Sequence, residues 1–407
     1  MTTTKNNEHK KLNVPNLRFK EFQGEWKEST IGEMFDLYSG NTPSRLNKEH
    51  FKGTVNWISS GELKEHYIYS SKEQISEEAA KSLKLLPVGT FVIAIYGLEA
   101  EGVRGTGSII QEPSTISQAC MSFIPKGVIG NEFLYSWYKK HGNVIGIRYA
   151  QGTKQQNLSY DILEKFMIAY PNTKEQEKLN KFIYLLDERI ATQNKIIEDL
   201  KKLKSAIVEN VFDDKHSERL QLDNVGSYIR GLTYSSNDVV EHGGTLVMRS
   251  NNIINGSLLD YNNNVVFVNK QMSAEQQLQN GDVVICMANG SSSLVGKSSF
   301  YDGSCHSPIT IGAFCGIYRS KEPIVKWLFQ TNKYRRYIWK SLQGGNGAIA
   351  NLNGEDILNM SFPIPNATIK DTCVKMLTSV DSALENNISL CALYTLQKQH
   401  LLRQMFI

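Results

Sequence analysis

One stretch of the sequence has the residue types that hold a nucleotide phosphate. Gly290 and Gly296 bracket five residues, and Lys297 and Ser298 follow the second glycine. A phosphate-binding loop has four residues between its glycines, because its backbone N–H groups must wrap around the phosphate in one geometry. The fifth residue, and the lack of an evident second strand to hold Mg²⁺, argue against nucleotide hydrolysis.

Other catalytic and metal-binding patterns are incomplete as well. Glu62-Leu-Lys64 resembles the last element of a metal-dependent nuclease site, but such triplets are common by chance. The sequence contains no Asn- or Asp-Pro-Pro-Tyr/Phe tetrapeptide of the kind that amino-methyltransferases use. Its six cysteines are scattered, without the paired spacing of a zinc site. We therefore predict no catalytic residue, no metal and no cofactor in this chain.

Charge and hydropathy leave DNA binding open and argue against a membrane. The formal net charge is only +4 over 407 residues, so any basic footprint must be local. The polar N-terminal segment lacks the apolar core of a signal peptide, and no stretch reaches the roughly 18 apolar residues of a membrane span. We expect a cytoplasmic protein with no membrane partner.

Several turns carry the side chains with which proteins contact DNA. Lys, Arg and small polar residues hold the phosphates, and Arg, Asn, Gln or Ser on loops reach base edges in the major groove. The candidate DNA-binding residues are Asn41, Thr42, Arg45, Ser59, Ser60, Arg104, Lys154, Gln155 and Gln156 in the first half, and Arg249, Ser250, Asn251, Asn289, Ser291, Lys297 and Asn346 in the second. For any single loop, ordinary turn formation is the alternative, so the prediction depends on the whole set. The densest basic cluster, Lys333 to Arg336, could face phosphates or form a solvated helix face.

The elements that must position these turns occur twice. An offset of 194 residues superimposes Asn157-Leu158 on Asn351-Leu352, Asp187 on Asp381, and Lys204 on Lys398. Each copy begins with a stretch rich in Gly, aromatic and β-branched residues, typical of strands and turns, and ends in a long segment without Pro or Gly. We predict an α+β protein with globular heads at 1–170 and 213–365, each followed by a helix, at 171–212 and 366–407.

Both helices have an apolar seam with heptad spacing. The seam consists of Ile183, Leu186, Ile190, Ile197, Leu200 and Ile207 in the first helix, and of Leu377, Val380, Leu384, Tyr394 and Leu401 in the second. Polar residues interrupt both seams at the same two places, Gln193 with Asn387 and Lys204 with Lys398. Each helix could pack on its own head, but matched seams favour two antiparallel helices that pack on each other about a pseudo-twofold axis. A helix of about 38 residues would be a spacer about 57 Å long, which predicts a split recognition site.

Several of these segments resemble one known family. The start of the chain, with Gly40-Asn-Thr-Pro-Ser and Phe51-Lys-Gly-Thr-Val-Asn-Trp-Ile58, is similar to that of type I restriction-modification specificity subunits. So is the block from Gly152-Thr-Lys-Gln-Gln-Asn-Leu-Ser159 through the first helix, which the chain repeats from Gly354 onward. The second half departs from the first because it has no sequence counterpart of Asn41-Thr-Pro, and its Gly344 block differs from the Gly152 block.

The resemblance implies a DNA-recognition role in a restriction system. Each head would be a target-recognition domain for one half of an asymmetric, bipartite site in double-stranded DNA. The helices would set the gap and dock two methyltransferase (modification) subunits, with restriction subunits joining outside them. S-adenosylmethionine, ATP and Mg²⁺ would bind to those partners. A stand-alone sequence-specific DNA-binding regulator is the alternative, and copurification with a methyltransferase would separate the two.

Overall fold

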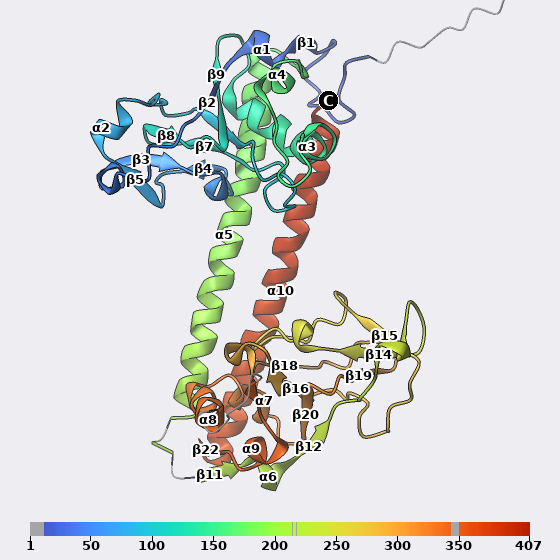
Figure 1. Cartoon of the computed structure of the whole chain (residues 1–407). Helices are drawn as coiled ribbons and strands as arrows, with labels where there is room; N and C mark the ends of the chain where they lie inside the picture. The colour runs from blue at the N-terminus through green and yellow to red at the C-terminus, as the bar shows by residue number, and fades with distance from the viewer. Residues whose placement is uncertain (1–11, 214, 217, 343–349) are drawn as a thin grey trace, which may run out of the picture. The chain divides into compact units, whose positions relative to one another are not determined.

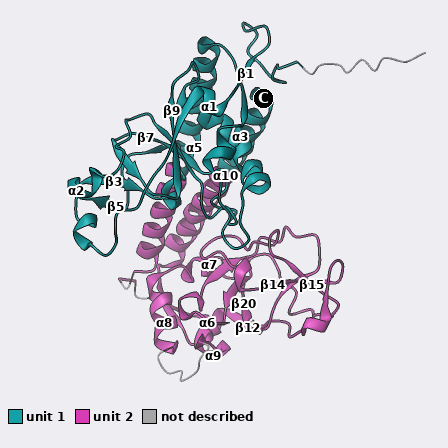
Figure 2. Cartoon of the chain, turned by 45° about the horizontal axis from the view of Figure 1, so that its top comes forward, with its two compact units in different colours: residues 1–194, 389–407 teal, residues 195–388 magenta. Residues whose placement is uncertain are grey.

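A computed structural model describes residues 12–213, 215–216, 218–342 and 350–407 of the chain. These residues divide into two compact units, which Figure 2 shows in different colours: unit 1 comprises 1–194 with 389–407, and unit 2 comprises 195–388. The two 39-residue helices, α5 (Thr173–Val211) and α10 (Ala367–Met405), each contribute one part to each unit. Among the described residues, no helix has both the length and the apolar composition to cross a bilayer.

Unit 1 contains a five-stranded and a three-stranded sheet. Most pairings are antiparallel, but β3 pairs with β8, and β4 with β7, in parallel. The five-stranded sheet has the order β2 (Phe35–Ser39), β9 (Cys120–Pro125), β6 (Phe91–Ala94), β7 (Gly107–Ile110) and β4 (Tyr67–Ile68). The three-stranded sheet has the order β5 (Glu73–Ile75), β3 (Val55–Ile58) and β8 (Ser114–Ile116). A separate two-stranded ladder pairs β1 (Lys27–Thr30) with β10 (Met167–Tyr170). The helices are α1 (Ile31–Met34), α2 (Glu77–Ala80), α3 (Asn131–Tyr149) and α4 (Tyr160–Leu163), with 3₁₀ turns η1 (Lys48–Phe51) and η2 (Ser60–Glu62).

Unit 2, whose elements are labelled in Figure 1, has a similar strand order. Among the described residues, its larger sheet has no equivalent of β4, and its smaller sheet has one additional strand. The larger sheet has the order β12 (Gly226–Arg230), β20 (Cys315–Ser320), β16 (Val283–Cys286) and β18 (Ser298–Phe300). The smaller sheet has the order β13 (Val239–Val240), β15 (Val266–Val268), β14 (Thr245–Met248) and β19 (Ile309–Ile311). Two-stranded ladders pair β11 (Glu218–Gln221) with β22 (Ser361–Ile364), and β17 (Ala288–Asn289) with β21 (Ala350–Asn351). The helices are α6 (Leu222–Val225), α7 (Val325–Leu328), α8 (Asn332–Leu342) and α9 (Gly354–Leu358), with 3₁₀ turns η3 (Ser236–Asp238), η4 (Ser250–Asn252) and η5 (Ser292–Leu294). Because β14 pairs with β19 in parallel, as β3 does with β8, the two units have equivalent small sheets.

The core of unit 1 joins the sheet, α3 and parts of both long helices. Phe91 and Phe133 are fully buried in it, beside Leu179 of α5. Phe406, just after α10, packs edge-on against Trp26 with 6.5 Å between ring centroids. Burying an aliphatic or aromatic side chain contributes about 1.5–3 kcal/mol, so residues at the far end of the chain stabilise the first head.

The core of unit 2 is built in the same way from the other parts of the long helices. Val208 and Val211 of α5 and Leu377 of α10 lie in one cluster with Trp327 and Tyr334. Trp327 is completely buried, and its indole Nε1 donates a 2.9 Å hydrogen bond to Asp381 of α10. Each head is therefore attached to both helices through apolar burial.

The seam residues of both long helices are buried or half-buried. This holds for every predicted seam position, whereas exposed apolar residues such as Leu185 and Leu393 lie outside the seam. In unit 1, α5 and α10 run antiparallel, because Arg189 stacks on Tyr394 and Asn194 accepts a hydrogen bond from the Cys391 thiol. The ends of each seam also lie in the cores of the heads, as the first of the two packing alternatives predicts.

Candidate nucleic-acid interface

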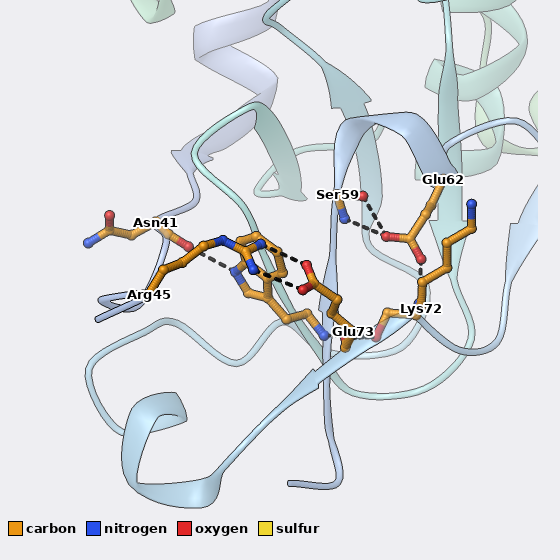
Figure 3. Close-up of polar contacts among 8 residues, drawn as sticks. Asn41, Arg45, Ser59, Glu62, Lys72 and Glu73 are labelled. Carbon is orange, nitrogen blue, oxygen red and sulfur yellow. Dashed lines mark hydrogen bonds and ion pairs between the residues drawn. The ribbon is translucent and has the colours of Figure 1, made fainter. Parts of the chain in front are cut away.

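The first candidate loop of unit 1, from Asn41 to Arg45, is held against β3. The Trp57 Nε1–H donates a 3.0 Å hydrogen bond to the backbone oxygen of Asn41. The Arg45 guanidinium makes a bidentate pair with Glu73, at 2.9 and 2.7 Å (Figure 3). It also lies 4.4 Å from the centre of the Phe51 ring. The hydrogen bond from Arg45 lowers the pKa of Glu73, so the pair stays ionised near neutral pH. Arg45 is oriented by its own unit, and any base contact that it makes must compete with Glu73.

The second candidate turn, at Ser59 and Ser60, follows directly after β3 and is closed by Glu62. The Glu62 Oε2 atom accepts hydrogen bonds from the Ser59 N–H at 2.9 Å and from the Ser59 hydroxyl at 2.6 Å. Its other oxygen, Oε1, accepts the Lys72 N–H at 2.6 Å (Figure 3). Glu62 therefore joins this turn to a neighbouring loop, and these hydrogen bonds occupy the carboxylate of the Glu62-Leu-Lys64 triplet.

Arg104 and the segment Lys154 to Gln156 form a second group in unit 1. The Arg104 guanidinium donates to the backbone oxygens of Leu98 and Glu99, at 3.4 and 3.5 Å. Gln156 accepts the Leu98 N–H at 3.0 Å and donates its own N–H to the Glu99 carboxylate at 2.9 Å. Because both segments contact Leu98 and Glu99, the structure brings together loops that are about 50 residues apart in the sequence.

Unit 2 has an equivalent of the Glu62 turn after β14. The side chain of Asn252, which is 1% exposed, accepts the Arg249 N–H at 2.9 Å. Its amide nitrogen donates to the backbone oxygens of Asp260 and Asn263, at 3.0 and 2.7 Å. Asn252 thus performs in unit 2 the two tasks of Glu62 in unit 1, because it closes the turn and attaches it to the loop that follows.

The remaining candidates of unit 2 lie beside this turn or on the next loop. The Asn289 side chain donates a 3.4 Å hydrogen bond to the Ser250 hydroxyl, so the two candidate segments meet. Ser291 bonds to Ser293 at 2.8 Å, and Asn251 is exposed. Lys297 is half-buried and precedes strand β18, whereas a phosphate-binding loop leads into a helix. Asn346 lies outside the described residues.

The second half has no sequence counterpart of Asn41-Thr-Pro, but the structure shows an equivalent backbone segment at Leu232. The Asn41 N–H donates to Ile116, and the Leu232 N–H donates to Ile311, in both cases to the parallel strand of the small sheet. A Cβ at either preceding glycine, Gly40 or Gly231, would lie 2.1 Å from a backbone oxygen. Both sites therefore require glycine, and Leu232-Thr-Tyr replaces Asn41-Thr-Pro with different side chains.

Sequence reasoning missed the residues that hold these turns in place. Ser59-Ser-Gly-Glu62 has the spacing of a capping box, in which the first and fourth residues satisfy each other's backbone N–H groups, so Glu62 could have been found. Arg249-Ser-Asn-Asn252 has no such signal, because Arg is not a typical cap residue. Among the described residues no group of His, Cys, Asp and Glu could hold a metal ion, so the candidate site consists of hydrogen-bonding and charged groups.

Comparison with known proteins shows which family part of the chain resembles. Residues 23–202 match the model of the type I restriction modification DNA specificity domain. This matched part, less than half of the chain, is similar to a type I restriction-modification specificity domain. This match confirms the family resemblance predicted from the sequence.

Individual relatives and structures agree with this family. The MjaIX specificity subunit of Methanocaldococcus jannaschii is 29% identical over 47% of this chain and 44% of its own length. The EcoR124I/EcoR124II specificity subunit of Escherichia coli is 32% identical over 45% of each chain. The matched stretches therefore span less than half of these curated relatives. A type I S subunit from M. genitalium shares the fold, with a TM-score of 0.59 and 16% identity over 97% of this chain and 99% of that one.

Proposed function

We propose that this specificity-domain protein is the DNA-recognition subunit of a type I restriction-modification complex, without a catalytic site of its own. One observation carries the proposal. At the ends of the equivalent strands β3 and β14, each unit presents a polar turn that a buried or half-buried side chain holds in place. Two equivalent turns with different sequences, Ser59-Ser-Gly and Arg249-Ser-Asn, suit the recognition of two different half-sites.

The finer architecture of this proposal is a pair of antiparallel coiled-coil helices related by a pseudo-twofold axis. Two salt bridges between the long helices support this arrangement. Asp187 pairs with Lys398 in unit 1, and Lys204 pairs with Asp381 at 2.7 Å in unit 2. The 194-residue offset of the repeat relates Asp187 to Asp381 and Lys204 to Lys398, so the two salt bridges are equivalent. Such a reciprocal pair of contacts is expected for helices related by a twofold axis. Such an arrangement suits two half-sites in opposite strand orientation.

The proposed partners are double-stranded DNA, two methyltransferase subunits and the restriction subunits. The printed names of the relatives support this assembly, because they are specificity subunits of type I restriction enzymes. S-adenosylmethionine, ATP and Mg²⁺ would then bind to the partner subunits, and the complex would act in the cytoplasm. The exposed apolar residues of the long helices outside the seam, such as Leu185 and Leu393, are available for contacts with other subunits.

Methylation mapping tests this function directly. The chain is co-expressed with its neighbouring methyltransferase, the complex is purified, and methylated positions in genomic DNA are mapped by single-molecule sequencing. We expect one asymmetric bipartite motif, and exchange of residues 1–170 for those of a relative should alter one half of it only. A chain that forms no complex, or a complex that yields no motif, would favour the stand-alone regulator.

The spacer role has its own test. Insertion of one helical turn into both α5 and α10 should change the preferred gap between the half-sites, because each turn adds about 5.4 Å to the separation. The two half-site sequences should stay the same. An unchanged gap in a complex that still methylates DNA would show that the helices do not set the spacing.

A further inference from the structure

Unit 2 contains a cavity between helix α8 and the loop that leads into β18. Its volume is about 1100 Å³, and Lys297, Tyr334, Arg335, Ile338 and Trp339 are among the residues that line it. No Asp or Glu lines this cavity in the described part of the chain. Its lining mixes apolar and polar side chains, and the cations in it, Lys297 and Arg335, suit an anionic ligand.

The segment around this cavity has an unbalanced charge. Residues 323–354 contain five Lys or Arg residues and no Asp or Glu. Lys326 is paired with Asp381, but Lys297, Arg335, Arg336 and Lys340 make no ion pair with a carboxylate among the residues that the structure describes. Arg335, Arg336 and Lys340 are exposed, so these charges face solvent and attract an anion at short range.

Buried contacts fix the helix and the loop to each other. The Tyr334 hydroxyl donates a 2.8 Å hydrogen bond to the backbone oxygen of Gly296, next to Lys297. The Tyr334 N–H donates to the Thr331 hydroxyl at 3.0 Å, and both residues are buried. Gly296 has a φ of +80°, and a Cβ there would lie 2.7 Å from Ile338 of α8. Lys297 and Arg335 are therefore held on one rigid wall and need little reorganisation to bind a ligand.

An exposed tryptophan adds an apolar contact to this cationic surface. Trp339 is 63% exposed and lines the same cavity as Arg335. Tryptophan and arginine are enriched among the residues that contribute most to binding, and tryptophan provides a large contact area at a small entropic cost. A sugar–phosphate backbone offers both an anionic phosphate and an apolar sugar face, which matches this combination.

We propose that the cavity residues Lys297, Arg335 and Trp339, together with the exposed Arg336 next to Arg335 on α8, form a docking surface for the phosphodiester backbone of double-stranded DNA. This surface would be separate from the base-recognition turn at Arg249 to Asn251. The proposal rests on the proposed function and deepens it by assigning the phosphate contacts of unit 2. Phosphate contacts fix the register of a protein on a duplex and carry no sequence information themselves. Loss of this surface therefore lowers affinity for every sequence and leaves the recognised motif unchanged.

The experiment compares three variants of the full complex with the methyltransferase. Arg335→Ala/Arg336→Ala removes both charges. Arg335→Lys/Arg336→Lys retains the charges but replaces each planar guanidinium group with an ammonium group. The control, Lys201→Ala/Lys202→Ala, removes two lysines of α5 that lie beside Glu198 and Asp199. Binding of one fluorescent duplex that carries the motif is measured by anisotropy at several salt concentrations. The methylation motif is mapped for each variant.

The salt dependence distinguishes the possible roles. Each phosphate contact contributes about 0.9 to the slope of log K against log salt, so the alanine pair should lower its magnitude by roughly 2. The variant Arg335→Lys/Arg336→Lys should have the same salt slope as the unmodified complex, and so should the control Lys201→Ala/Lys202→Ala. All variants should methylate the same motif as the unmodified complex. Three results would overturn the proposal: an unchanged slope for the alanine pair, relaxed base preference in both arginine variants, or failure of the alanine pair to assemble with the methyltransferase.

The proposed function is judged separately from this surface. If the unmodified complex binds the duplex but yields no bipartite motif, the proposed recognition role is wrong. The salt dependence of binding would still show whether Arg335 and Arg336 contact phosphates. If the unmodified complex does not bind duplex DNA, both proposals fail. Circular dichroism checks that the variants are folded, which we expect because Arg335 and Arg336 are exposed and alanine favours helices.

Discussion

Helices α3 and α8 follow equivalent strands, but their cations have different surroundings in the two units. In α3 of unit 1, burial lowers the pKa of Lys139 to about 8, and its ammonium group lies 5.1 Å from the Tyr135 ring centre. The adjacent Lys140 donates a 2.5 Å hydrogen bond to the backbone oxygen of Phe406, at the end of α10. In α8 of unit 2, Arg335 and Arg336 are exposed instead. A repeated strand order therefore does not imply a repeated binding surface.

The repeated aspartates of the long helices show a second difference. Asp381 is 5% exposed and contacts Lys204, Lys326 and the Trp327 indole N–H. Asp187, its counterpart, is half-buried and contacts Lys398 and His66. The ion pair with the other helix is common to both aspartates, whereas the head supplies a different partner in each unit.

The largest expected effect is that of Asp381→Ala. Removal of this carboxylate leaves Lys204 and the Trp327 N–H buried without their partner, so unit 2 should lose about 3–5 kcal/mol of stability. Asp187→Ala should cost less, about 1–3 kcal/mol, because its surroundings are more hydrated. Urea unfolding of the full chain measures both, with the exposed Asp371→Ala as control. Equal losses for the two aspartates would contradict the comparison.

The next effect concerns the two equivalent turns. Asn252→Ala removes three hydrogen bonds of a buried amide and should cost about 1–3 kcal/mol. Glu62→Ala should cost about 0.5–2 kcal/mol, as for the loss of a cap, and Glu62→Gln should restore part of this because an amide oxygen still accepts the Ser59 N–H. Methylation mapping should show relaxed preference in one half-site for Glu62→Ala and in the other for Asn252→Ala. If Glu62→Ala and Asn252→Ala both relaxed the base preference in the same half-site, the two turns would not be equivalent.

A pH dependence should distinguish unit 1 from unit 2. His66 is half-buried between the rings of Tyr67 and Tyr135, and its two ring nitrogens lie 3.2 and 2.9 Å from Asp187 and Glu132. Burial opposes its charge, but the two carboxylates outweigh burial and raise the pKa of His66. Two carboxylate acceptors require two N–H donors, which only the protonated ring provides.

The sign of this dependence follows from the raised pKa. The stabilisation by His66 should be complete below its unfolded pKa of about 6.5 and should disappear as the pH rises through its folded value. His66→Gln should abolish this loss of stability above about pH 6.5, as measured by urea unfolding at each pH. Lys139 is present in both proteins, so its contribution cancels in the difference. An identical pH profile for the variant would show that His66 does not carry the charge.

The smallest effect on stability should be that of Arg45→Ala. The ion pair with Glu73 is exposed, and such pairs contribute about 0.2–1 kcal/mol. The effect on DNA should be larger if Arg45 reaches a base, because a bidentate arginine discriminates by about 1–3 kcal/mol. Glu73→Gln frees the arginine without removing it and should leave the motif intact. A motif that is unchanged in Arg45→Ala would exclude Arg45 from base recognition.

Side-chain periodicity made the helices predictable, whereas the turns depend on backbone contacts. All seam residues from Ile183 to Leu401 follow a spacing that can be counted along the chain, and the structure leaves none of them exposed. The match of Leu232 with Asn41 could not be found in this way, because it consists of a backbone hydrogen bond to a parallel strand. The candidate DNA-binding residues remain predictions that the experiments above can test.

The sequence by itself determined the repeat, the α+β composition, the two long helices and the resemblance to one family. These properties depend on local periodicity and on residue identity, which the chain carries without its fold. Only the tertiary structure decided that Glu62 and Asn252 hold equivalent turns, and that Arg335 and Arg336 of α8 are exposed while Lys139 and Lys140 of α3 are half-buried. Burial and hydrogen bonding between segments distant in the chain produce these differences, and no local pattern records them.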